Sequence, residues 1–131
     1  MIDCYDAYRM PGHLLTAELF AEVWAKVTGA VVLNLVGNLR RTLVPAILGG
    51  LARAFPDWKI AVFAVPDEAR GRHPIANFIV HVNGALPDLA GRTVPVAPFL
   101  GETTAARIEP EIDPERAYTD ATARTWVPVT E

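Results

Sequence analysis

The chain contains no serine and only one cysteine, Cys4. Without serine, the commonest hydroxyl nucleophile is missing, so only Cys4 or a threonine could attack a substrate covalently. A single cysteine cannot form an internal disulfide bond, which agrees with a reducing compartment. These two scarcities argue against a serine hydrolase and against a disulfide-stabilised secreted domain.

Long hydrophobic runs are also missing. No stretch of about 18 consecutive apolar residues occurs, so we expect no membrane-spanning helix. The N-terminal stretch MIDCYDAYRMPG carries acidic residues where a signal peptide has a basic region followed by an apolar one. We therefore expect a cytoplasmic protein.

Metal, cofactor and nucleic-acid signatures are absent from the sequence. Its three histidines, His13, His73 and His81, lack the spacing of a metal-binding pair, and no dinucleotide or phosphate-binding glycine pattern occurs. We expect no cofactor. The net charge is −3, and aromatic residues are not interleaved with the arginines, so nucleic acid is not an expected partner.

The 131 residues are 51% hydrophobic and 21% charged, which is typical of a single globular domain. Apolar periodicity predicts helices over 14–28 and 38–55 and strands over 30–36, 59–65 and 77–82. The order α-β-α-β-β indicates an α/β fold, with α+β as the alternative: a three- or four-stranded mixed sheet and two main helices. Gly49-Gly50 lowers the propensity of the second helix and allows close packing against it.

The stretch NLVGNLRRTLVP, residues 34–45, turns from a strand into a helix. Pro45 is compatible with that helix if Thr42 is the N-cap and Leu43 begins the first turn. Unpaired N–H groups of a first turn attract anions, and neighbouring arginines would add positive charge. The sequence favours a capped helix with solvated arginines, and the ligand-binding hypothesis names Asn38, Arg40, Arg41 and Thr42.

A second polar candidate is the loop DEARGRHP, residues 67–74. Arg70, Arg72 and His73 could clamp an anion or transfer a proton. Polar loops of this composition mostly form turns, and the sequence favours that interpretation. The loop and the turn at Asn38 together define an alternative function, a small anionic-ligand-binding protein or enzyme.

Charge is unevenly distributed along the chain. Residues 1–100 hold nine Lys or Arg against eight Asp or Glu, whereas residues 101–131 hold three against seven. The sequence thus divides into a compact domain, 1–100, and an acidic C-terminal arm rich in Pro and Thr, 101–131. Asp113-Pro114-Glu115 is typical of an N-cap followed by proline, which predicts a short helix near 114–124.

The arm ends in apolar residues that a free terminus would expose to water. They either fold back onto the domain or dock on a partner protein or a second copy, and the predicted contacts are Tyr118, Trp126, Val127 and Val129. The arm therefore favours a non-enzymatic protein-interaction or assembly subunit that self-associates or joins a complex. Structural components of phage-like assemblies, inhibitors and accessory subunits fit this description.

Overall fold

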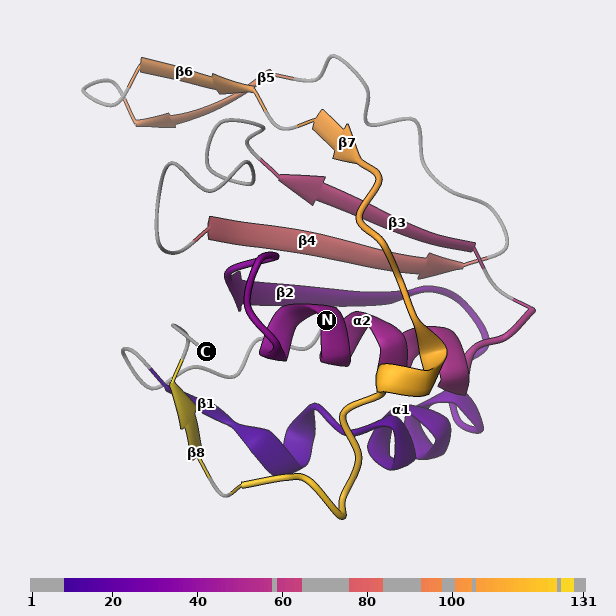
Figure 1. The fold of residues 1–131 in the computed structure, drawn as a ribbon. Coiled ribbons are helices and arrows are strands. Elements are labelled where there is room, and N and C mark those ends of the chain that lie inside the picture. The colour runs from indigo at the N-terminus through magenta and orange to yellow at the C-terminus, as the bar shows by residue number, and fades with distance from the viewer. Residues whose placement is uncertain are drawn as a thin grey trace.

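The central unit of the molecule has the predicted element order, helix-strand-helix-strand-strand (Figure 1). The computed structural model describes residues 9–57, 59–64, 76–83, 93–97, 101–104, 106–124 and 126–128. The central elements are α1 (Ala17–Trp24), β2 (Val31–Gly37), α2 (Leu43–Ala54), β3 (Lys59–Ala64) and β4 (Ala76–Asn83).

These strands and β7 (Ala106–Ile108) form a four-stranded sheet in the order β2-β4-β3-β7. Every neighbouring pair is antiparallel, so the predicted mixed sheet is wrong and the fold is α+β. β2 and β3 run in the same direction, but β4 lies between them and pairs with both. Antiparallel pairing of β3 with β4 needs no crossover helix, and β4 is long enough to pair with all seven residues of β2 and all six of β3.

Side chains alternate across β4 between the two faces of the sheet. Phe78, Val80 and Val82 are buried toward the helices, whereas Ile79 is 41% exposed on the opposite face. β2 shows the same alternation between buried and half-buried residues. One face of the sheet is therefore packed against the helical layer.

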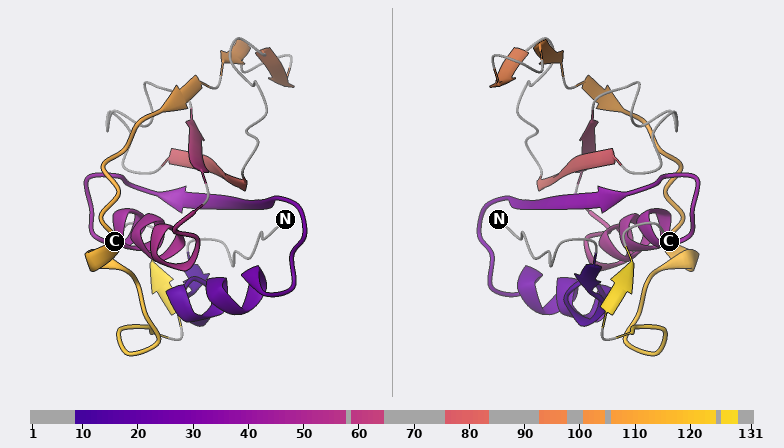
Figure 2. Two further views of the ribbon diagram at one scale, coloured as in Figure 1. Left: turned by 90° about the vertical axis from the view of Figure 1, so that its right-hand side faces the viewer. Right: turned by 90° about the vertical axis from the view of Figure 1, so that its left-hand side faces the viewer.

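Helix α2 lies between the sheet and α1 (Figures 1 and 2). The predicted face of Leu43, Ile47 and Leu51 is buried, but so are Val44 and Leu48 on other sides of the helix. The buried side chains thus cover a wide arc of the helix, and Arg53 is exposed outside this arc. α2 is thus the centre of the hydrophobic core.

Helix α1 is shorter than the predicted 14–28. The Thr16 side chain accepts a hydrogen bond from the Leu19 N–H at 3.3 Å and caps its start. Beyond Trp24 the N–H of Val27 bonds to the Trp24 carbonyl, so tighter turns replace the helix before Gly29 is reached. The Trp24 ring packs edge-on against Phe55, with centroids 5.2 Å apart, and joins α1 to the end of α2.

Four further elements lie outside the central unit. β1 pairs with β8 and β5 pairs with β6, both antiparallel, and these pairs form separate two-stranded sheets. Their bounds are β1 (Arg9–Pro11), β5 (Thr93–Ala97), β6 (Gly101–Thr104) and β8 (Trp126–Pro128). Because β8 pairs with β1, the C-terminal part of the chain returns to its own N-terminal part.

Between β7 and β8 the chain crosses the helical layer, and we call residues 109–124 the strap. The Asp113 side chain accepts a hydrogen bond from the Glu115 N–H at 3.0 Å, and Pro114 opens the following 3-10 turn, η3 (Pro114–Arg116). The predicted cap at Asp113 is confirmed, although the regular turn it begins is short. A second 3-10 turn, η1 (Gly12–Leu14), connects β1 toward α1.

Candidate functional site

The turn between β2 and α2 is built on Asn38. Its side-chain oxygen accepts a hydrogen bond from the Arg40 N–H at 2.8 Å, and its backbone carbonyl accepts one from the Arg41 N–H at 3.2 Å. Asparagine favours such turns because its side chain can bond the backbone two residues on. Asn38 therefore shapes the turn, and it does not line the pocket described below.

Helix α2 begins at Leu43 rather than near residue 38, with Thr42 in the N-cap position, which is the start that the sequence offered as compatible with Pro45. The Thr42 hydroxyl makes no capping hydrogen bond, because the Thr42 backbone is already helical rather than extended. Pro45 has no N–H, and the N–H groups of Leu43 and Val44 have no carbonyl partner within the helix. Leu43 and Val44 are buried, so the helix start acts on the pocket through its dipole.

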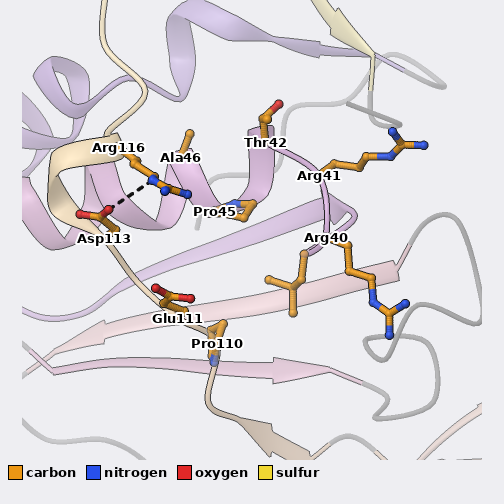
Figure 3. A pocket seen from close by; sticks show the side chains of 10 residues that line it. Arg40, Arg41, Thr42, Pro45, Ala46, Pro110, Glu111, Asp113 and Arg116 are labelled. Carbon is orange, nitrogen blue, oxygen red and sulfur yellow. Dashed lines mark ion pairs between the residues drawn. The ribbon is translucent and has the colours of Figure 1, made fainter.

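A pocket of about 580 Å³ opens at this end of α2 (Figure 3). One wall comes from the turn and the first helical residues, and the other comes from the strap. The lining residues are Leu39, Arg40, Arg41, Thr42, Pro45, Ala46, Pro110, Glu111, Asp113 and Arg116. The pocket therefore joins two segments that are far apart in the sequence.

Charges of both signs surround the pocket. Asp113 is engaged within the strap, because one of its oxygens bonds the Glu115 N–H and the other lies 3.3 Å from the Arg116 Nε. In Figure 3 the side chains of Arg40 and Arg41 extend away from that pair. Arg41 and Arg116 are exposed at the surface. Arginine side chains from both walls of the pocket are thus exposed to solvent.

The structure places some of the predicted ligand-binding residues at the pocket, and others lie outside the residues that it describes. Arg40, Arg41 and Thr42 line the pocket, and Asn38 holds the turn behind them. The predicted residues of the loop, Arg70, Arg72 and His73, lie outside the described residues, so their part in ligand binding stays a prediction. Sequence reasoning missed the strap wall, because no local pattern links an acidic segment to a helix start earlier in the chain.

The predicted partner-binding residues are also divided. Tyr118 is 9% exposed and Val127 is 1% exposed, and both belong to the core of their own chain. Trp126 is 45% exposed, and Val129 lies outside the described residues. Two of the apolar side chains in the arm are thus covered by the body of the same molecule, while the indole remains accessible.

A second hollow, of about 420 Å³, lies beside the start of α1 and includes His13, Glu22 and Asp120. Within the described ranges, no three or more His, Cys, Asp or Glu side chains are grouped to hold a metal ion. Neither α1 nor α2, the helices seen in the described part of the chain, has the length and apolar character needed to span a bilayer.

No protein-family model, no curated protein and no solved structure matches this chain.

Proposed function

We propose that the chain is a non-enzymatic protein-interaction domain that holds a carboxylate-bearing, partly apolar segment of a partner protein in the pocket at the start of α2. The observation that carries this proposal is the composition of the pocket. Its lining combines the apolar surfaces of Leu39, Pro45, Ala46 and Pro110 with arginines from both walls. An apolar centre with a charged rim is the usual anatomy of a protein-recognition site.

The charge balance favours an acidic occupant. Three arginines, Arg40, Arg41 and Arg116, stand against two carboxylates, Glu111 and Asp113, among the lining residues, so the lining has a net charge of +1. The helix start adds partial positive charge, since its first N–H groups point out of the helix. A carboxylate of the partner would gain from both sources, whereas an ammonium group would be repelled.

Holding a ligand fits these groups better than transforming it. The Asp113 carboxylate is engaged by the Glu115 N–H and by Arg116, so it is poorly placed to accept a proton from a substrate. A guanidinium group holds a carboxylate through its planar set of N–H donors, so the arginines act as anchors rather than as acids or bases. Support for an interaction role thus comes from the chemistry of the lining residues.

Fluorescence anisotropy with a labelled peptide of alternating Leu and Glu tests the proposal. We expect saturable binding that weakens as salt is added, and no binding of the matched peptide in which Lys replaces Glu. Arg41→Glu should weaken binding by about tenfold, since it places a like charge at the rim. Arg53→Glu makes the same charge change on α2 away from the pocket and should leave the affinity within about twofold.

Equal binding of both peptides, or equal loss in the Arg41 and Arg53 variants, would contradict the proposal. Inorganic phosphate and citrate are included in a thermal-shift series with the same proteins. A folded-state ligand must raise the melting temperature. Phosphate or citrate could raise the melting temperature of the unmodified chain but not that of Arg41→Glu, while the Leu-Glu peptide does not bind. In that case the pocket is a small-anion site instead.

A second candidate function, self-association in an assembly, is favoured by the exposed Trp126. Large exposed aromatic side chains are enriched at protein interfaces. Light scattering over a concentration series of the full chain should then show a mass above that of the monomer, and Trp126→Ala should return it to the monomer. The substitution is cleaner than deleting residues 101–131, because the deletion also removes β7 and the strap. A monomer at every concentration excludes this candidate.

A further inference from the structure

One wall of the pocket belongs to the strap, and hydrogen bonds tie the strap to both helices. The N–H of Tyr118 donates to the Ala46 carbonyl at 2.9 Å, and the N–H of Ala17 donates to the Tyr118 carbonyl at 2.8 Å. The backbone of this one residue therefore connects the first turns of both helices. A third bond runs from the Asp120 N–H to the Glu18 carboxylate at 3.0 Å.

The strap approaches α2 closely because of a glycine. A Cβ added at Gly49 would collide with the backbone carbonyl oxygen of Asp113, which a small rotation of a side chain cannot relieve. At Gly50 a Cβ would meet the Tyr118 carbonyl oxygen at 3.5 Å, an ordinary van der Waals contact. Gly49 is thus required for docking of the strap, whereas Gly50 tolerates a methyl group.

Side-chain burial contributes less to this docking than to the sheet side of α2, because Ile112 and Ala123 pack against the core while only half-buried. Along residues 109–124, all of which the structure describes, Tyr118 is the one buried residue, and the others are half-buried or exposed. The sheet side of α2 instead buries a continuous set of apolar side chains. Segments with little apolar burial open locally at a lower free energy than the core.

We propose that the strap is a clasp that opens as a unit while the sheet and both helices stay folded, and that its opening removes one wall of the pocket. This regulation of binding rests on the proposed function of the pocket. A partner segment held between the two walls binds the closed clasp. Binding therefore raises the equilibrium constant for closure by the same factor by which closure raises the affinity for the partner. Access to the pocket is then controlled by residues 109–124.

Native-state hydrogen exchange of the full chain, followed by NMR, tests the clasp directly. The amides of Ala17 and Tyr118 report opening, because their bonds cross the interface between strap and body. The Phe20 amide, which bonds to the Thr16 carbonyl within α1, and the Val80 amide in the central strand serve as references. We expect Ala17 and Tyr118 to exchange together, about tenfold or more faster than Phe20 and Val80.

Gly49→Ala and Gly50→Ala form a matched pair of variants. Gly49→Ala should raise exchange at Ala17 and Tyr118 by about tenfold or more and leave Val80 unchanged, whereas Gly50→Ala should leave all of these rates within about twofold. Glu18→Ala, a milder change that removes one acceptor, should accelerate Tyr118 by a few-fold. Exchange of Ala17 and Tyr118 at the rate of Val80, or equal acceleration of Val80 in Gly49→Ala, would overturn the clasp.

Adding the Leu-Glu peptide separates this inference from the proposed function. If both hold, saturating peptide slows exchange at Ala17 and Tyr118, and Gly49→Ala weakens peptide binding while Gly50→Ala does not. If the peptide does not bind but the exchange pattern is as expected, the proposed function fails and the opening of the strap stands. If the peptide binds equally well to both glycine variants, coupling between strap and pocket is refuted.

Discussion

Helix α2 is covered by different means on two of its sides. Toward the sheet it contributes fully buried apolar side chains that meet Leu33, Phe78 and Val80. Toward the strap it contributes the Ala46 carbonyl, which accepts a hydrogen bond from the Tyr118 N–H, and Gly49, which lies against the Asp113 carbonyl. The first interface depends on the amount of apolar surface removed from water, and the second depends on the shape of two backbones. The two sides should therefore respond differently to substitution.

The largest expected effect is on the sheet side of this comparison. Leu48 is fully buried, so Leu48→Ala should lower the free energy of unfolding by about 2–5 kcal/mol, through lost burial and the cavity left behind. Urea denaturation measures it. Ile79→Ala on the outer face of the sheet should change stability by about 0.5 kcal/mol or less. A loss as large for Ile79→Ala would mean that the outer face is also a packed interface.

At the far end of the strap, Gly12→Ala should have the next largest effect. An added Cβ would collide with the Arg124 carbonyl oxygen and lie 2.7 Å from the Tyr118 hydroxyl, so the end of the strap must move. Overpacking of this kind costs about 1–3 kcal/mol. Gly29→Ala is the control, because nothing lies within 4 Å of its added Cβ. Thermal or urea unfolding measures the stability of both variants. Equal stability of Gly12→Ala and Gly29→Ala would contradict the close packing at Gly12.

A smaller effect distinguishes the starts of the two helices. Thr16→Ala removes the side-chain cap of α1 and should cost about 1 kcal/mol. Thr42→Ala removes a hydroxyl that makes no capping bond and should cost less than about 0.5 kcal/mol. Urea unfolding of the two variants provides the comparison. Equal losses would show that Thr42 caps α2 in solution.

The smallest effect is expected within the strap itself. The ion pair between Arg116 and Asp113 is exposed, with 81% of the Arg116 side chain accessible. Arg116→Ala should therefore change the free energy of unfolding by less than about 0.5 kcal/mol. Chemical denaturation in low and high salt measures this change. A loss above about 1 kcal/mol would show that the pair helps to hold the strap on α2.

Much of the central unit could be predicted from sequence. The alternation in β4 and the four-residue repeat in α2 indicate which faces are buried, because the spacing of apolar residues follows the period of the strand or helix. Helix ends were less predictable: the pattern continues past Trp24, but tighter turns end α1 there. The mixed character of the sheet was mispredicted and the strand order was not predicted, since apolar alternation indicates which face is buried but not which strand lies alongside.

The candidate site shows the same division. Arg40, Arg41 and Thr42 were identified because they stand at a strand-to-helix turn, which is a local pattern. Pro110 and Glu111 were not connected with them, because that contact depends on the path of the strap across α2. Gly49-Gly50 was the one sequence feature that indicated a close approach, and Gly49 indeed lies against Asp113.

By itself the sequence determined the order of the central elements and the apolar patterns of α2 and β4, and it allowed the start of α2 at Leu43 without deciding it. Only the tertiary structure decided that β4 separates β2 from β3, that Tyr118 and Val127 are covered by their own chain, and that the strap completes the pocket. The reason is physical: periodicity and capping act between residues a few positions apart, whereas strand order and strap docking depend on contacts between distant segments.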